Sequence, residues 1–254
     1  MKRYLSTVRF RTLACFVFLC GAGTFCLFSS ASAQQFSVDL GEGTAMTTRL
    51  IQMIALLTVL SVAPSIMLMV TSFTRMLVVF SFLRNAMGTQ STPPNMVLVS
   101  LAMFLTLFVM MPTLEQSYEA GIRPLVEGRM DEFEAMENAA KPFHTFMIRH
   151  VRDQDIRLFL DLARVGEVAT AEETPYRALI PAFMISELRR AFEIGFLIFL
   201  PFLIIDMVVA SVLMSMGMMM LPPIMISMPF KIIFFVLIDG WYMLAGSLVQ
   251  SYGP

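Results

Sequence analysis

The sequence predicts an all-α, membrane-associated protein built from helical hairpins that assemble with copies of themselves. Of its 254 residues, 57% are hydrophobic and only 15% are charged, whereas soluble domains are nearer half apolar and a quarter charged. Long apolar stretches follow one another along the chain, and the polar segment between them has helical spacing without a strand pattern. The net charge of −1 gives no reason to expect nucleic acid as a partner.

The N-terminus has the features of a secretory signal peptide spanning residues 1–33. Basic residues precede the apolar run Leu13–Phe28, and Ala31-Ser32-Ala33 then forms an A-x-A cleavage site before Gln34. The alternative is an uncleaved anchor, because the apolar run is slightly long. Cleavage would leave a mature chain free of cysteine and hence of disulfides and thiolate ligands, since all three cysteines lie in this segment: Cys15, Cys20 and Cys26.

Residues 34–112 are predicted to form a first helical hairpin. Leu50–Val70 has 21 residues without a charge and contains Pro64, and about 20 apolar residues are needed to span a bilayer. A break rich in turn residues runs from Gly88 to Pro94. The second apolar stretch, Met96–Met111, has only 16 residues and is short for a span.

Residues 113–180 form a polar segment that we expect to be helical and periplasmic. Its part up to Arg177 carries 13 acidic and 8 basic residues. Apolar residues such as Met130, Phe133 and Met136 recur at helical spacing, which predicts two or three amphipathic helices. The expected breaks between these helices are at Pro124, Gly128 and Pro142.

Residues 181–254 are predicted to form a C-terminal helical hairpin. Its apolar stretches, Ala191–Met214 and Ile224–Val249, are separated only by the nonapeptide SMGMMMLPP, Ser215–Pro223. So short a connection makes the two helices antiparallel neighbours.

Two opposite charges in this hairpin are predicted to form a buried ion pair. Asp206 and Lys231 are equally far along the chain from the midpoint between Met218 and Met219, so they lie level across the hairpin. An ionised side chain at mid-bilayer costs about 2.5–3.5 kcal/mol on insertion scales, which favours pairing. The alternative is that each residue lines a watery seam by itself.

A second group of charges lies near the start of the third apolar stretch. Glu187, Arg189, Arg190 and Glu193 are spaced so that they can pair along one helix.

Of the four apolar stretches, one is too short for a span and two carry charges. Such helices are better suited to packing against each other, or against copies, than to facing lipid, and we expect an obligate assembly.

Several separated motifs resemble one known family. PAFMISELRRAFEIGF, Pro181–Phe196, and PFLIID, Pro201–Asp206, resemble the signature of the flagellar biosynthetic protein FliP family and its counterparts in injectisome type III secretion. Three further features resemble the same family: the segment Thr74–Gly88, the pair Pro93–Pro94 and the loop Met218–Pro223. The resemblance extends from Leu50 to the C-terminus, and a cleavable signal peptide is more typical of the flagellar branch.

The resemblance implies a subunit of a protein export gate. Members of this family form five copies of a hairpin subunit that join FliR and FliQ in a closed channel for unfolded flagellar subunits. The channel lies in the bacterial inner membrane, within the flagellar basal body and among other export-apparatus proteins. In the assembled gate the apolar helices are largely raised above the membrane plane on the periplasmic side, which suits short, charged helices.

The resemblance also implies that Met218, Met219 and Met220 form a gasket across the pore. Methionine is unbranched and polarizable, so it repacks easily around different side chains, and a ring of such loops would be an apolar constriction that gates by dewetting. We expect Gly217 to allow close approach of neighbouring loops, and Pro222 and Pro223 to stiffen the entry into the next helix.

Other functions are less well supported by the sequence. An injectisome subunit remains the nearest alternative. A Met-lined copper(I) transporter would use soft thioether ligands, but adjacent methionines in a turn do not share a face. His144 and His150 are expected to be ordinary surface or hydrogen-bonded histidines. We find no catalytic motif, metal-ligand pattern or phosphate-binding loop, so we expect no enzyme, metal or cofactor, and the energy for export must come from elsewhere.

Overall fold

The computed structural model describes residues 44–89, 91–166, 170–218 and 221–253. The predicted signal peptide, Met219 and Met220 lie outside these ranges. The chain divides into two compact units, residues 1–58 and 59–254. All regular secondary structure in the described ranges is helical, which confirms the predicted fold class.

Helix α2, Thr44–Val70, contains the whole first apolar stretch, with Pro64 inside it. In the second unit the chain then turns by 80° at Thr71–Ser72 into α3, Phe73–Met87. Gly88 ends α3 in the left-handed conformation, with φ of 77°, which favours glycine at such a C-terminal cap.

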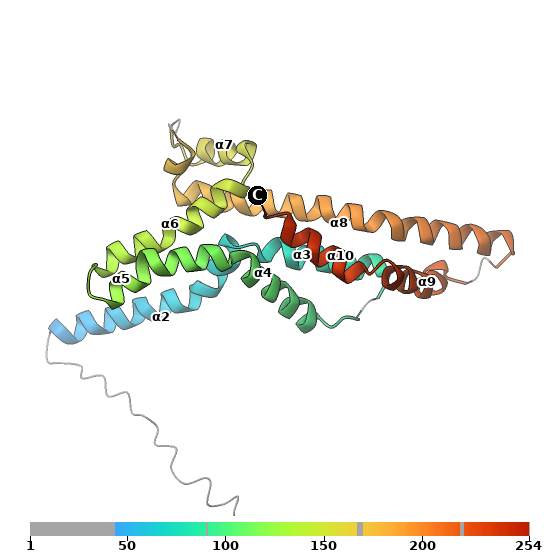
Figure 1. The fold of residues 1–254 in the computed structure, drawn as a ribbon, viewed down its shortest axis with the longest axis horizontal. Coiled ribbons are helices and arrows are strands. Elements are labelled where there is room, and N and C mark those ends of the chain that lie inside the picture. The colour runs from blue at the N-terminus through green and yellow to red at the C-terminus, as the bar shows by residue number, and fades with distance from the viewer. Residues whose placement is uncertain (1–43, 90, 167–169, 219–220, 254) are drawn as a thin grey trace, which may run out of the picture. The chain divides into compact units, whose positions relative to one another are not determined.

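Helix α3 is the centre of the second unit. Its residues Met76, Val79, Phe80, Leu83 and Ala86 are no more than 1% exposed. Their spacing of three and four residues forms one continuous apolar stripe. Figure 1 shows α3 lying among the helices that follow it. Its stripe packs in a cluster with buried residues of these helices: Leu98, Ala102, Ala191, Phe202, Phe235, Leu244 and Leu248.

Helix α4, Asn95–Ser117, is longer than the second apolar stretch. It continues through a π-helical turn, Tyr118–Ile122, into α5, Arg123–Val126. The continuous helix Asn95–Val126 has 32 residues and is long enough to cross a membrane, so the expectation that this stretch is too short was wrong. The residues become more polar after Pro112, but the helix does not end there, because proline removes only one backbone hydrogen-bond donor.

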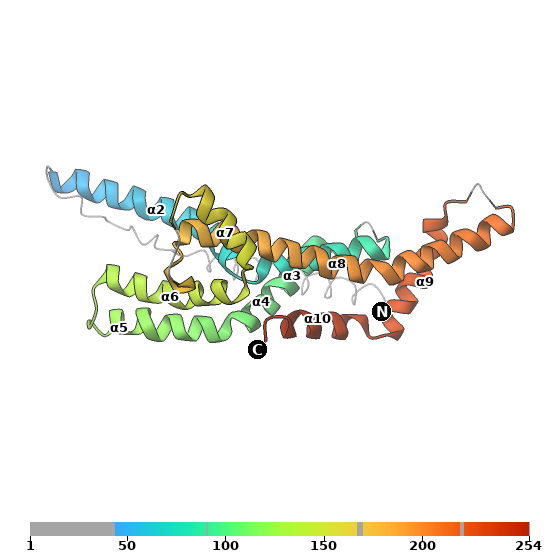
Figure 2. The ribbon, with the colours of Figure 1, turned by 90° about the horizontal axis from the view of Figure 1, so that it is seen from above.

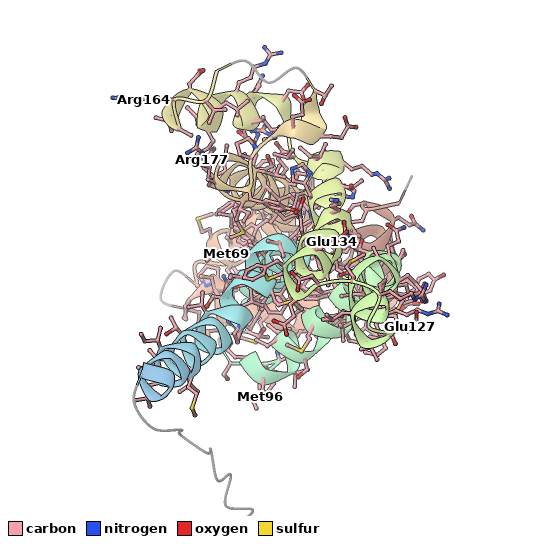
Figure 3. All side chains as sticks on the ribbon, turned by 90° about the vertical axis from the view of Figure 1, so that its left-hand side faces the viewer. Met69, Met96, Glu127, Glu134, Arg164 and Arg177 are labelled. Atoms are coloured by element: carbon pink, nitrogen blue, oxygen red, sulfur yellow. The ribbon has the colours of Figure 1, made fainter. Side chains whose placement is uncertain are left out.

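The polar segment folds mainly into α6, Glu132–His150, and α7, Asp153–Leu162, followed by a 3₁₀ turn, Ala171–Glu173. Pro142 lies inside α6, so the break expected there is absent, whereas Gly128 has a φ of 68° between α5 and α6. In Figure 3 charged side chains gather around this segment, where Glu127, Glu134 and Arg164 are labelled.

Helices α4 and α6 approach each other closely. A Cβ on Gly121 would lie 2.4 Å from the carbonyl oxygen of Ala135 and 2.6 Å from Cβ of Ala139. The Ser117 hydroxyl donates a hydrogen bond of 2.7 Å to the carbonyl of Ala139. Near the other end of α6, a second cluster packs α6 against α4 and α8 through buried apolar residues: Met110, Phe146, Met147, Leu179 and Phe183.

The C-terminal region consists of α8, Tyr176–Ser215, α9, Pro223–Leu237, and α10, Gly240–Gln250. With 40 residues, α8 is about 60 Å long. Figure 2 shows α9 returning beside the far end of α8, as the predicted hairpin requires. The fourth apolar stretch is not one helix, because the chain bends by 63° between α9 and α10.

The bend has a local cause. Asp239 has a φ of 52°, a left-handed conformation that a helix interior does not allow. A Cβ on the next residue, Gly240, would lie 2.2 Å from the ring of Phe235, so only glycine fits. Within the described ranges, Asn95–Val126 and Tyr176–Ser215 are each long and apolar enough to span a membrane, and two bent pairs qualify jointly.

Candidate functional site

The hairpin tip begins where α8 ends. The amide of Gly217 donates to the carbonyl of Met214 at 3.1 Å, and the amide of Met218 donates to the carbonyl of Leu213 at 3.0 Å. Together these two bonds form a Schellman motif, in which the residue after the helix takes a left-handed conformation. Gly217 has a φ of 72°. The motif projects Met218 beyond the helix end, where its side chain is 43% exposed.

Within this chain the backbone conformation of Gly217 gives the residue a role of its own. The close approach of loops from neighbouring copies stays a prediction, and inside this chain space does not require the glycine, because a Cβ there would meet no described atom within 4 Å. Its positive φ does, because glycine carries no steric cost there. Pro222 precedes α9 with φ of −67° and ψ of 115°, and Pro223 is the first residue of that helix, a position for which its fixed φ is suited.

Behind the tip, the structure brings Asp206 and Lys231 together. The Nζ atom of Lys231 lies 2.6 Å from Oδ2 of Asp206, and the Ser227 hydroxyl donates to Oδ1 at 2.5 Å. Lys231 is only 3% exposed. Each carboxylate oxygen of Asp206 therefore has a donor from α9, which sets the register of α9 against α8.

Lys231 also connects the hairpin to α3. Its Nζ donates to the carbonyl of Ala86 at 3.0 Å. Ala86 is in the last turn of α3, where carbonyls lack partners in their own helix and the helix dipole is negative. One ammonium group thus joins three helices, and this third contact was not predicted from the sequence.

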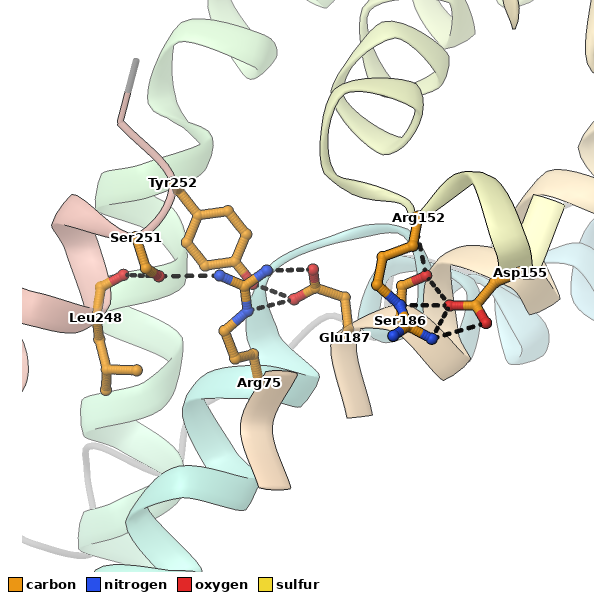
Figure 4. A network of polar contacts seen from close by, with 8 residues as sticks. All are labelled: Arg75, Arg152, Asp155, Ser186, Glu187, Leu248, Ser251 and Tyr252. Carbon is orange, nitrogen blue, oxygen red and sulfur yellow. Dashed lines mark hydrogen bonds and ion pairs between the residues drawn. The ribbon is translucent and has the colours of Figure 1, made fainter. Parts of the chain in front are cut away.

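A larger buried network surrounds Arg75 of α3 and Glu187 of α8 (Figure 4). Both side chains are fully buried. Arg75 forms a two-pronged ion pair with Glu187, in which its Nε atom lies 2.8 Å from Oε2. Its Nη1 atom donates to the Ser251 hydroxyl at 2.9 Å. The guanidinium lies 3.8 Å from the ring centroid of Tyr252, whose hydroxyl donates to Glu187.

This network corrects the expected charge cluster on one helix. Glu187 pairs across to α3, and not with its own helix. Arg189 does pair with Glu193, at 2.9 Å, but both side chains are more than half exposed, and such pairs contribute little. Arg190 is half-buried. The difference arises because Glu187 lies on the buried face of α8, which local spacing does not reveal.

The residue before Glu187 extends the network to the polar segment (Figure 4). The Ser186 hydroxyl donates to Oδ2 of Asp155 at 2.6 Å and accepts from the amide of Arg152 at 3.1 Å. The Arg152 guanidinium donates to both oxygens of Asp155 at 3.0 Å. Two neighbouring residues of α8 therefore contact different helices: Glu187 binds α3, and Ser186 binds the start of α7.

The two histidines have partners. Nε2 of His144 lies 2.7 Å from the carbonyl oxygen of Thr174. His150 is buried between Phe146 and Tyr252, with ring centroids 4.7 Å and 5.0 Å away. Burial, assisted by the positive charges of Arg75, Arg149 and Arg190, lowers the pKa of His150 to about 4. It is therefore neutral at neutral pH.

Sequence reasoning missed the Arg75–Glu187 pair. Arg75 interrupts an apolar run, and an isolated charge in such a run signals a partner. Its partner is 112 positions away on a helix not joined to α3 by a short loop, so no hairpin arithmetic identifies it. Asp206 and Lys231 were identifiable because a tight turn connects their helices.

Long apolar helices that are linked by buried ion pairs, and leave large apolar side chains exposed, define a helical membrane protein. A family model described as the FliP family matches residues 56–248. The chain is 57% identical to flagellar biosynthetic protein FliP of Caulobacter vibrioides, covering 88% of this chain and 85% of the relative. Identity is 53% to that of Agrobacterium fabrum (87% and 93%) and 52% to that of Bacillus subtilis (85% and 97%).

The chain therefore belongs to the FliP family of flagellar biosynthesis proteins, which are components of the flagellar export apparatus. This confirms the resemblance drawn from the motifs. The motif Pro181–Phe196 contains Ser186 and Glu187, so the segment that carries the resemblance is also the one on which two polar networks meet.

Proposed function

We propose that this chain is a core subunit of the channel through which unfolded flagellar subunits are exported, assembled as a pentamer with FliQ and FliR. The proposal places it in the inner membrane within the flagellar basal body, with the polar segment facing the periplasm. Family membership supports export as the process. The hairpin formed by α8 and α9 supports a channel-forming role.

The observation that carries the proposal is the unpartnered apolar surface of this hairpin. Along the second half of α8 and on α9, many large apolar side chains are more than half exposed: Phe196, Leu197, Ile204, Met207, Val208, Val212, Met225, Phe230, Ile233 and Val236. Its conformation is nevertheless determined by the Asp206–Lys231 pair inside it. A rigid hairpin with apolar outer faces is suited to packing beside equivalent hairpins around an axis.

In this arrangement the tips of several hairpins would converge. Met218 projects from the end of α8, and Met219 and Met220 follow in the same loop. We propose that these three methionines form the gasket that seals the resting channel, since thioether side chains can exclude water and then repack around a passing chain. The Schellman motif at Gly217, together with Pro222 and Pro223 at the start of α9, would give each loop the same position along the channel axis.

The test replaces Met218, Met219 and Met220 by alanine in the full chain, expressed with its partners. We expect cells to become permeable to small ions and to a permeant dye, and growth to stop before export does. The matched control is Met136→Ala, which removes an exposed methionine from α6, outside the hairpin. Cells that stay impermeable to the dye with all three methionines removed would show that the loop is not the seal.

Assembly is tested separately. We expect the mass of the complex purified after co-expression with FliQ and FliR to correspond to five copies of this chain. A stable, active single protomer in the membrane would contradict the proposed oligomer. The two experiments are independent, because a pentamer with a different seal would pass the second and fail the first.

A further inference from the structure

A groove between α4 and α10 ends beside basic side chains. Its apolar part, of about 630 Å³, is lined by both helices, including Phe104, Phe108, Met243, Gly246 and Val249. A second hollow of about 340 Å³ adjoins it through Phe108 and Val249, and is lined also by Pro112, Arg149 and His150. Figure 2 shows α10 running toward the middle of α4 and the end of α6, where this second hollow lies.

The two parts of the groove differ in charge, because Arg149 lines the second hollow and no charged side chain of the described residues lines the first. The apolar stretch of α4 ends at Pro112, where the acidic segment begins. α10 ends at Gln250, which also lines the groove. The apolar part therefore lies along helices that qualify as spans, singly or as a bent pair, and the hollow with Arg149 lies where their apolar surface stops. A membrane lipid has the same order of apolar and polar parts.

The charge at this end is positive and uncompensated. Arg149 is exposed and Arg190 half-buried, and neither guanidinium has a hydrogen-bond or ion-pair partner among the described residues. Both are near enough to His150 to contribute to the lowering of its pKa. Glu187, three residues before Arg190 on α8, is already paired with Arg75 and accepts a hydrogen bond from Tyr252.

We propose that this groove binds one anionic phospholipid, with the phosphate against Arg149 and an acyl chain along Phe104 and Phe108. A guanidinium suits a phosphate because it presents several donors in one plane, and basic pockets beside membrane helices are a recurrent site for acidic headgroups. The proposal rests on the membrane location of the chain and not on its role in a channel, so failure of either leaves the other standing.

The test uses the full-length protein, purified in detergent and stripped of lipid, with bound lipid counted by native mass spectrometry. Phosphatidylglycerol and phosphatidylcholine with identical acyl chains are titrated in parallel. We expect phosphatidylglycerol to bind about fivefold more tightly, the effect of one basic residue near a headgroup. Arg149→Gln should abolish this preference. The control Arg157→Gln removes an exposed arginine from α7 and should preserve it.

A second variant tests the acyl part while Arg149 is kept. Gly246 lines the groove and a Cβ there meets nothing within 4 Å, so we expect the Gly246→Leu side chain to extend into the groove and to weaken binding of both lipids. Equal binding of the two lipids by the unmodified protein would overturn the proposal. So would displacement of the lipid by inorganic phosphate, or variants that change the number of associated copies but not the bound lipid.

Discussion

The buried pair between Arg75 and Glu187 makes the sharpest prediction. Glu187→Gln keeps the size of the side chain and one hydrogen-bond acceptor but removes its charge. Both partners are fully buried, so Arg75 would keep a positive charge inside the protein with no anionic partner, stabilised only by the neutral amide oxygen, Ser251 and the ring of Tyr252. Desolvation of that unpaired charge is the reason for the expected loss of stability.

The magnitude follows from the burial. Removing one partner of a fully buried ion pair costs about 3–5 kcal/mol. In a chain of this length about 1 kcal/mol shifts the midpoint of thermal unfolding by roughly 2–4 °C. Glu187→Gln should therefore lower the midpoint by about 6–20 °C. Tyr252 also loses the carboxylate that accepts the hydrogen bond of its hydroxyl, which places the effect toward the upper part of this range.

The measurement is thermal unfolding of the purified protein in detergent, followed by the fluorescence of Trp241, the single tryptophan. The matched control is Glu193→Gln on the same helix, which breaks the exposed pair with Arg189. Exposed pairs contribute about 0–1 kcal/mol, so this variant should unfold within a few degrees of the parent. Replacing both Arg75 and Glu187 by methionine should cost less than Glu187→Gln alone.

Equal shifts of the unfolding midpoint for Glu187→Gln and Glu193→Gln would refute this prediction, since these variants differ mainly in the burial of the pair. A double replacement that is more damaging than either single one would also contradict it. In that case the side chains would be needed for shape at the contact of α3 with α8, and not for mutual neutralisation of charge.

Three further outcomes are expected. Asp206→Ala or Lys231→Ala alone should prevent assembly of the complex, while exchanging the two residues should partly restore it; complete absence of rescue would count against a direct pair. Gly121→Ala should destabilise the chain by about 1–3 kcal/mol in thermal melts, as overpacking does, because its Cβ would meet the backbone of α6, whereas Gly246→Ala should be nearly neutral. His150 has a folded pKa of about 4, below the ordinary 6.5, so the unfolded chain takes up the proton first and stability should fall as pH decreases from about 6.5 to 4; His150→Phe should flatten this dependence.

Local sequence patterns were enough to predict much of the fold of this protein. Composition and the length of the apolar stretches determined that the chain is helical and membrane-associated, because a run of apolar residues in lipid must satisfy its backbone within a helix. The nonapeptide Ser215–Pro223 determined the hairpin of α8 and α9. With the turn known, the spacing of Asp206 and Lys231 was enough to place them opposite each other.

Helix ends and bends were harder to predict. The polar residues after Pro112 suggested an end to α4, yet the helix continues, because hydropathy reports surroundings and not backbone continuity. The bend between α9 and α10 lies in an apolar run and depends on the left-handed backbone of Asp239 and on the close approach of Gly240 to the ring of Phe235. Hydropathy does not indicate a single left-handed residue.

What only the tertiary structure decided is which charges meet between helices that no short loop joins. Glu187 had plausible partners one turn away, and its actual partner, Arg75, comes from the first half of the chain. Sequence spacing describes neighbours on one helix or across one tight turn, whereas α3 and α8 are brought together by burial of the apolar stripe of α3. The ion pair follows from that packing, and so does the position of Arg149 beside the groove of α4 and α10.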